Sequence, residues 1–310
     1  MKEYSSASSY TNTRPSAVTI GTFDGVHLGH RAILERLVKT ATDENLDSVL
    51  LTFFPHPRMV LQKDVQLKLI NTIDERKELI KKTGLDQLVI HPFTKEFSRL
   101  TALQFVRDIL VNCLNVKKII IGYDHRFGRN RNATIEDLKE FGITYDFEVI
   151  EITAQELDEV AISSSKIRRA LENGHIKTAN SYLGYLFMLN GTIVKGKGIG
   201  KTLDFPTANL QVEENYKIIP KNGVYVVQSN ISGERVFGIT NIGTNPTFGG
   251  SVKTIETYFL DFNEILYDKF LKLEFLKRIR DEVNFETSDN LKEAIKKDES
   301  FAREYIKSNE

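Results

Sequence analysis

Two histidines, His27 and His30, stand three residues apart where an apolar segment gives way to a helical pattern. Residues 18–32, VTIGTFDGVHLGHRA, predict a short strand, a turn rich in Gly and Asp, and the start of a helix. Backbone N–H groups and the positive end of a helix dipole meet at such a junction and favour phosphate oxygens. Two imidazoles on one face can donate to a phosphate while charge develops during attack at phosphorus. The pattern indicates nucleotidyl transfer; the alternative is a helix N-terminus with two surface histidines.

The composition describes an ordinary globular protein of two domains. The chain has 310 residues, 41% of them hydrophobic, and 42 basic residues balance 42 acidic ones. A net charge of zero favours neither a nucleic acid nor an anionic membrane as partner. We expect a cytoplasmic protein, because no apolar run approaches a membrane span and the first residues do not form a secretory signal.

Two local features complete this outline. Residues 1–16 are polar and rich in Ser and Thr, which predicts a flexible N-terminal arm. The single cysteine, Cys113, excludes an internal disulfide and lies in an apolar helical pattern. We expect a buried structural thiol there.

The first half alternates strand-like and helical segments. Strands are predicted from Val18 and over residues 48–54, 87–91, 117–121 and 145–152, and helices over residues 30–40, 74–83 and 101–114. This alternation indicates βαβ units and a parallel sheet, in which ligands bind beyond the carboxyl ends of the strands.

Three loops follow predicted strands and carry polar residues. His56 lies between Pro55 and Pro57, and is either a substrate contact or part of a rigid loop. Residues 122–129 hold an acid, a histidine and two arginines, which form either a ligand site or a salt-bridged turn. Residues 162–171, ISSSKIRRAL, begin a helix with serines and cations. Because cations oppose the dipole of a first turn, we favour a polyphosphate contact over a solvated face.

The second half has a different period. Short strands are predicted over residues 187–194, 223–229, 235–242, 254–262 and 269–279, after a linking segment over residues 177–185. Turn residues separate them, which indicates an antiparallel sheet or barrel. Residues 287–306 then predict a terminal amphipathic helix or helix pair.

A glycine-rich basic loop and one carboxylate stand out in this half. The loop, KGKGIGKT at residues 195–202, fits neither the Walker spacing nor G-x-G-x-x-G, although glycines would let backbone amides approach phosphates. Glu256 lies in an otherwise apolar strand, as either a structural pair or a general base.

Four motifs of the first half resemble those of a known enzyme family. The segments GTFDGVHLGH, FPHP, GYDHRFG and ISSSKIRRAL resemble the FMN adenylyltransferase module of bacterial bifunctional riboflavin kinase/FAD synthetases. The resemblance implies that His27 and His30 bind ATP phosphates and stabilise the transition state. Ser164, Ser165 and Arg168 would hold pyrophosphate, although Ser165 stands where the family often has Thr, and His125 where it often has an aromatic residue. Further contacts implied for ATP are Gly21, Phe23, Asp24 and Ser163, and for FMN and adenosine they are Phe54, His56, Asp124 and Arg126.

The second half resembles the riboflavin kinase module through GTIVKGKGIGKTLDFPTANL, NIGTNPTF and ETYFLDF. The resemblance implies that Glu256 accepts the proton of the ribityl 5′-hydroxyl and that Thr207 and Asn209 bind Mg²⁺ and the ATP phosphates. Lys201 and Asp204 replace the usual Arg and Gly, which puts kinase efficiency in question. The other contacts implied for ATP or flavin are Gly196, Gly198, Gly200, Lys201, Pro206, Asn241 and Arg280.

The sequence thus predicts an α/β domain plus a β domain. Residues 17–183 would form a Rossmann-like HxGH nucleotidyltransferase domain with a parallel sheet, and residues 184–310 an antiparallel riboflavin-kinase barrel with a terminal helix. The expected substrates are ATP, riboflavin and FMN with Mg²⁺ as cofactor, the expected clients are flavoproteins, and the expected catalytic residues are His27, His30, Arg168 and Glu256. The alternatives are an adenylyltransferase whose barrel only binds flavin, a relative of class I aminoacyl-tRNA synthetases, and nucleotidyl transfer to another acceptor.

Overall fold

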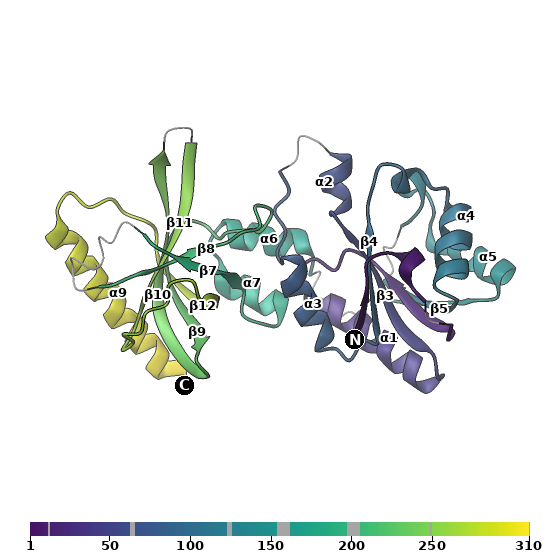
Figure 1. Cartoon of the computed structure of the whole chain (residues 1–310), viewed down its shortest axis with the longest axis horizontal. Helices are drawn as coiled ribbons and strands as arrows, with labels where there is room; N and C mark the ends of the chain where they lie inside the picture. The colour runs from purple at the N-terminus through teal and green to yellow at the C-terminus, as the bar shows by residue number, and fades with distance from the viewer. Residues whose placement is uncertain are drawn as a thin grey trace. The chain divides into compact units, whose positions relative to one another are not determined.

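The computed structural model describes residues 1–11, 13–62, 66–122, 126–153, 162–196, 205–247 and 250–309. Its contacts divide into two compact units, Met1–Ser164 and Ser165–Glu310 (Figure 1). This division falls before the boundary at 183/184 that the sequence predicts, because α6 and α7 are grouped with the second unit. Each unit is described separately below.

The first unit is built on a six-stranded parallel sheet. Its strands lie in the order β1-β4-β3-β2-β5-β6, and each neighbouring pair is parallel. The bounds are β1 Lys2–Tyr4, β2 Ser16–Ile20, β3 Asp47–Phe54, β4 Gln87–Pro92, β5 Val116–Gly122 and β6 Glu148–Ile152. The order reverses at β2, which places the loops after β2 and β5 on either side of a switch point. The predicted parallel sheet is confirmed.

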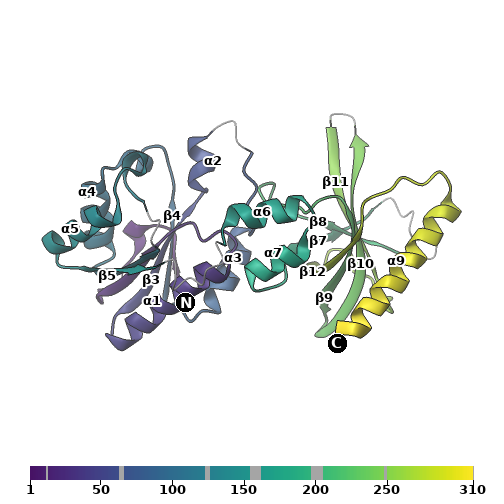
Figure 2. The same cartoon turned by 180° about the vertical axis from the view of Figure 1, so that it is seen from behind.

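Helices cover both faces of this sheet (Figures 1 and 2). Helix α1 (Leu28–Asp43) contacts β2, β3 and β5 through buried leucines, while η3 (Phe105–Cys113), a π-helical segment, packs with α5 (Ile135–Tyr145) into one core cluster. Cys113 is partly buried against that cluster, and burial raises the pKa of its thiol. The remaining helices are η1 Ala7–Ser9, α2 Pro57–Leu61, α3 Ile73–Lys81, η2 Phe97–Arg99, α4 Ala102–Gln104 and η4 Arg129–Arg131.

The flexible N-terminal arm is a wrong prediction. Residues 2–4 form β1, which pairs with β4 along the sheet edge, and η1 follows with a capping box between Ser6 and Ser9. Tyr4 and Tyr10 are buried in the core cluster, and the Ala7 amide donates to His91 Nδ1 at 3.1 Å. Tertiary pairing outweighs the polar composition, because the strand gains its stability from β4.

A second difference lies between β5 and β6. The predicted strand over residues 145–152 begins late, at Glu148, since α5 extends to Tyr145. This helix starts with a capping box in which Thr134 and Asp137 exchange side-chain hydrogen bonds. The T-x-x-D spacing was the sequence signal for it.

The second unit is a closed six-stranded barrel with three helices beside it in the described part of the chain. The strand order is β10-β11-β8-β7-β12-β9, with antiparallel neighbours. The bounds are α6 Ser164–Glu172, α7 Ile176–Leu183, β7 Met188–Val194, β8 Ala208–Gln211, β9 Gly223–Ile231, β10 Glu234–Thr247, β11 Gly250–Phe259, β12 Phe270–Arg280 and α9 Ser288–Asn309. The predicted barrel is confirmed, β8 was missed, and the linking segment is mostly helix α7.

The terminal helix is a single helix, α9, held against the barrel by charges. Arg280 on β12 forms a two-pronged ion pair with Asp298, whose side chain is 6% exposed. Arg303 pairs with Asp261 in the same two-pronged way. Ala302 lies in the core cluster beneath the helix.

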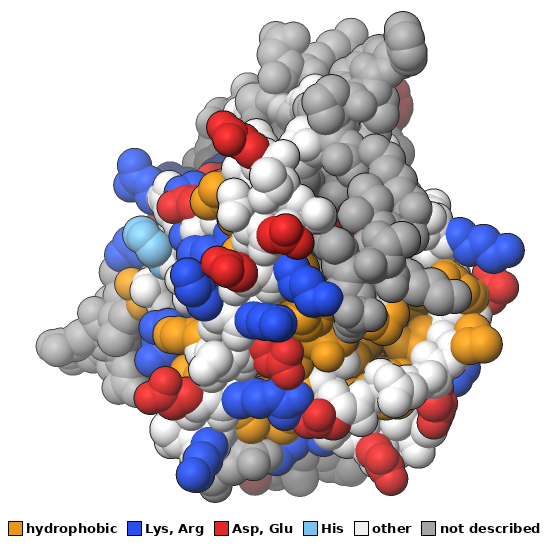
Figure 3. All heavy atoms as spheres, turned by 90° about the vertical axis from the view of Figure 1, so that its left-hand side faces the viewer, with side chains coloured by type: hydrophobic (Ala, Val, Ile, Leu, Met, Phe, Trp, Pro, Cys, Tyr) orange, Lys and Arg blue, Asp and Glu red, His pale blue; other side chains and the backbone are white. Residues whose placement is uncertain are grey.

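Charges of both signs are interspersed on the face drawn in Figure 3, around a group of hydrophobic side chains. Among the described residues, no helix is both long and apolar enough to cross a membrane.

We predict that Tyr4→Ala lowers the free energy of unfolding of the first unit by about 3 kcal/mol, because it empties a buried aromatic site. Urea denaturation measures this loss. Ser5→Ala is the control, since Ser5 is exposed in the same segment. A Tyr4→Ala value equal to that of the control would mean that β1 contributes nothing to the sheet.

Candidate active sites

The turn between β2 and α1 is tightly bent. Phe23, Gly25 and Val26 have φ angles of 47°, 92° and 35°. For a β-branched residue such as Val26 a positive φ is strained, so the surroundings must stabilise it. Gly21 begins the turn, and a Cβ there would lie 2.9 Å from the Phe23 ring, so the close approach of this ring requires glycine.

The two histidines are stacked at the start of α1. Their ring centroids lie 3.6 Å apart, and Phe23 lies 4.7 Å from the His30 ring. His27 is the N-cap residue, and its Nδ1 accepts from the His30 amide at 3.3 Å. The Nδ1 atom of His30 is buried without a hydrogen-bond partner in the described structure. A phosphate can therefore reach each ring only through Nε2.

Both imidazoles are neutral in this setting. Burial lowers the pKa of His27 to about 4, despite the nearby Asp24 carboxylate. Burial also lowers the pKa of His30 well below 6.5, and the charges of His27 and Arg76 add to this effect. A neutral imidazole whose Nδ1 is an acceptor carries its proton on Nε2, where it can donate to an anion.

The ISSS segment meets this turn. The Ser164 hydroxyl donates to the Asp24 carbonyl at 2.8 Å, within the first unit. Asp24 itself is fully buried, and its carboxylate accepts from the amides of Ile70 and Asn71. Sequence reasoning missed the partner of this carboxylate, Arg76, which also lies fully buried in α3.

The remaining predicted residues of the first half are placed as follows. His56 is the buried N-cap of α2, with Nδ1 accepting from the Arg58 amide at 3.1 Å, which fits a rigid loop and leaves substrate contact untested. Phe54 ends β3, and Arg126 is exposed. Asp124 and His125 lie outside the described residues. Ser165 and the buried Arg168 belong to the second unit, and Ser163 lies just before α6.

In the barrel, three polar residues lie in one row across neighbouring strands. Glu256 on β11 is paired with Asn209 on β8 and with Asn241 on β10. Residues directly opposite each other in a sheet project from the same face, so the three side chains share one surface. Thr207 joins them, since its hydroxyl donates to Glu256 Oε2 at 3.4 Å.

This row offers oxygen ligands of the kind that Mg²⁺ prefers. The Thr207 hydroxyl and the Asn209 amide are hard, neutral donors, suited to an ion that keeps waters and binds mainly through substrate phosphates. No group of three or more His, Cys, Asp and Glu side chains with metal-site geometry occurs in the part of the chain that the structure describes. The Thr207 hydroxyl and the Asn209 amide oxygen fit an Mg²⁺ ion that ATP carries.

Among the other predicted kinase residues, the structure describes Gly196, Pro206 and Arg280. A Cβ at Gly196 would lie 2.2 Å from the Asn209 amide nitrogen, so this backbone lies against the Asn209 side chain. Pro206 is exposed beside Thr207. The guanidinium of Arg280 forms a two-pronged ion pair with Asp298, and its predicted ligand contact stays a prediction. Gly198, Gly200, Lys201 and Asp204 lie outside the described residues.

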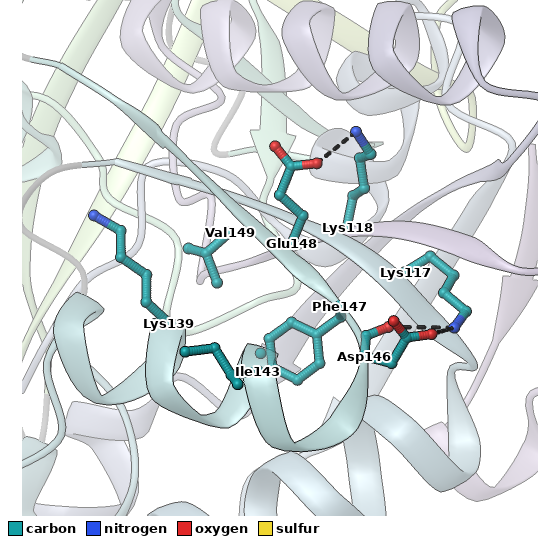
Figure 4. A pocket seen from close by; sticks show the side chains of 9 residues that line it. Lys117, Lys118, Lys139, Ile143, Asp146, Phe147, Glu148 and Val149 are labelled. Carbon is teal, nitrogen blue, oxygen red and sulfur yellow. Dashed lines mark hydrogen bonds and ion pairs between the residues drawn. The ribbon is translucent and has the colours of Figure 1, made fainter.

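A hollow lined by lysines lies elsewhere on the first unit (Figure 4). Lys117 pairs with Asp146 and Lys118 with Glu148, as the dashed lines show. These residues lie at the amino ends of β5 and β6, opposite to the edge where parallel sheets bind ligands. With its lysines neutralised, this hollow is a poor candidate for a phosphate site.

Comparison with known proteins assigns both units. Residues 9–166 match the family model described as FAD synthetase, and residues 183–306 match the one described as riboflavin kinase. A bifunctional riboflavin kinase/FMN adenylyltransferase of Buchnera aphidicola from Schizaphis graminum is 38% identical over 295 residues, covering 94% of each chain. The chain belongs to the bifunctional riboflavin kinase/FMN adenylyltransferase family. It phosphorylates riboflavin to FMN and adenylylates FMN to FAD, as the sequence predicts.

Other members of this family are similar over the same length. The enzymes named in the same way from Listeria monocytogenes and Escherichia coli K12 are each 35% identical, over 93% of this chain and 92% of theirs. A crystal structure described as a macrolide-efflux protein from Streptococcus pneumoniae has a TM-score of 0.89 at 32% identity, covering 97% of this chain and 98% of that one. ATP, riboflavin and FMN are thus the substrates of the two units.

We predict that acid destabilises the first unit through its stacked histidines. The unfolded chain protonates these imidazoles near pH 6.5, whereas folded His27 stays neutral down to about pH 4. Their contribution to stability is therefore complete above pH 6.5 and is lost as the pH falls through this window. In His30→Gln, the free energy of unfolding should depend less steeply on pH between these limits. Urea titrations with the exposed His175→Gln as control measure the slope, and equal slopes in both variants would contradict the prediction.

Proposed function

We propose that the stacked pair His27 and His30 stabilises the transition state of adenylyl transfer. The observation that carries this assignment is their geometry: both Nδ1 atoms are buried or bonded, so both Nε2 atoms are left for phosphate oxygens. An FMN phosphate oxygen attacks the α-phosphorus of ATP, and the bond to the pyrophosphate oxygen breaks. Negative charge grows on the oxygens around phosphorus, and the two imidazole N–H groups together with the α1 dipole stabilise it.

We assign the binding of the pyrophosphate leaving group to residues at and just before the start of α6. We expect Ser163, Ser165 and Arg168 near the start of α6 to bind it, together with Ser164. Ser164, the last residue of the first unit, donates to the Asp24 carbonyl in the turn that precedes the histidines, and this contact supports its assignment. Arginine suits this task, since its planar fork matches phosphate oxygens.

In the barrel, Glu256 is proposed as the general base of riboflavin phosphorylation. Its carboxylate accepts the proton of the ribityl 5′-hydroxyl, whose oxygen then attacks the γ-phosphorus while ADP leaves. The support is the common row of Glu256 with Asn209 and Asn241, and the approach of Thr207. When bound at Thr207 and Asn209, Mg²⁺ would neutralise charge on the phosphates. The backbone at Gly196 lies against the Asn209 side chain, and we expect it to contact these phosphates.

The wider setting also belongs to this proposal. We place the enzyme in the cytoplasm, with small molecules as its ligands and flavoproteins as recipients of FMN and FAD. Fractionation of cells tests the location. Neither a nucleic acid nor a membrane is part of the proposed function.

We expect His30→Ala to reduce FAD formation from FMN by about 10²- to 10³-fold or more, because one donor to the transition state is lost. FMN formation from riboflavin should persist. Chromatography of flavins after incubation with riboflavin, ATP and Mg²⁺ measures both steps, with His175→Ala as control. Loss of both activities together would argue against separate sites.

Glu256→Gln should have the opposite effect. Removal of the base should lower FMN formation by about 10²- to 10⁴-fold, while FAD formation from added FMN continues. Glu274→Gln is the matched control, because Glu274 is a partly buried glutamate on β12 that pairs with Gln228. Retained kinase activity in Glu256→Gln would exclude Glu256 as the base.

A further inference from the structure

Arg76 is a cation that the fold buries. It lies in the first half of α3 and is 1% exposed. Its Nη1 donates to the Thr22 carbonyl at 2.8 Å, and its Nη2 lies 3.9 Å from Asp24 Oδ1. Both contacts are to the turn that precedes the histidines. One buried guanidinium thus joins α3 to this turn.

Asp24 in the turn also binds the segment that precedes α3. Asp24 Oδ1 accepts from the Ile70 amide at 3.0 Å and from the Asn71 amide at 3.3 Å, just before α3 begins. The first turn of α3 is itself fixed by the capping box of Thr72 and Glu75. The turn and the start of α3 therefore hold each other through charge-assisted hydrogen bonds, which are stronger than neutral ones.

The turn needs such support because its backbone is strained. Phe23 and Val26 have φ angles of 47° and 35°, a conformation that side chains other than glycine adopt only where the surroundings stabilise it. Thr22 on one side is held by Arg76 and by the Thr52 hydroxyl, at 3.2 Å. His27 directly follows Val26, so a relaxed turn would move the N-cap imidazole and the ring stacked on it.

We propose that Arg76 and Asp24 are positioning residues for adenylyl transfer, which hold the turn of residues 22–26 so that His27 and His30 face the nucleotide correctly. This inference rests on the proposed role of the two histidines. Arg76 touches no reacting atom: its guanidinium is buried and bound to the protein. Asp24, which the sequence assigned to ATP binding, has its carboxylate turned to backbone amides and to Arg76.

Arg76 has an electrostatic effect in addition. Its charge lowers the pKa of His30, as does that of His27. Loss of Arg76 should therefore raise the pKa of His30, and this change can be measured without any activity assay.

Kinetics of FAD formation test the proposal with Arg76→Met, Arg76→Lys and the control Lys81→Met, a surface cation of the same helix. Arg76→Met should lower kcat by about 10²-fold, because displacement of the histidines weakens contacts made in the transition state, with KM for ATP within about twofold. Arg76→Lys keeps the charge and should recover part of kcat. FMN formation by the barrel should remain unchanged in all three variants.

A buried, unpaired Asp24 carboxylate could also destabilise Arg76→Met, so a double variant separates the two effects. Asp24→Asn with Arg76→Met removes both charges and should restore the free energy of unfolding but not kcat. Recovery of kcat together with stability would mean a purely structural role and would overturn the proposal. So would an unchanged kcat in Arg76→Met, or a rise in KM alone.

Histidine NMR gives the second readout. The His30 signal, assigned by its loss in His30→Ala, should titrate at higher pH in Arg76→Met than in the unaltered protein. An unmoved titration would contradict the effect of the Arg76 charge on His30. If His30→Ala itself retained FAD formation, the proposed role of the histidines would fail, whereas this NMR shift would still report whether Arg76 acts on His30.

Discussion

The turn between β2 and α1 depends on a buried carboxylate that accepts hydrogen bonds from backbone amides. Asp24 accepts amide hydrogen bonds from the segment before α3, and Arg76 of that helix returns a hydrogen bond to the Thr22 carbonyl. These contacts join the turn between β2 and α1 to the segment that leads into α3. They stabilise a turn in which a β-branched residue has a positive φ. The stacking of His27 and His30 is found directly after that turn.

The barrel positions its candidate residues in a different way. There the hydrogen-bond register of three strands brings Asn209, Glu256 and Asn241 into one row, without a buried ion pair among them. Side chains on a closed barrel have few alternatives, because a slip by one residue would turn them to the other face. Positioning by register is consistent with phosphoryl transfer, which depends mainly on placement and charge neutralisation.

The sequence predicted best what depends on local pattern. Apolar runs such as residues 48–54 and 117–121 located central strands, and the H-x-G-H spacing located the imidazoles of the first site. Prediction from local pattern failed for β1, whose polar residues form a strand only by pairing with β4. It also failed for Arg76, because residues 74–78, DERKE, look like a solvated helical face, whereas the fold buries Glu75 and Arg76. Such burial depends on Asp24, which lies about fifty residues earlier, and no local pattern records it.

In the proposed assignment, each of the two reactions has a site of its own that works without the other. The most direct test mixes the Glu256→Gln variant with the His30→Ala variant and supplies riboflavin, ATP and Mg²⁺. Separate sites predict that FMN released by the second variant is adenylylated by the first, so that FAD accumulates in the mixture but in neither variant alone. A mixture that forms FMN and no FAD, while Glu256→Gln still adenylylates added FMN at low concentration, would show that the two steps cannot be separated in this way.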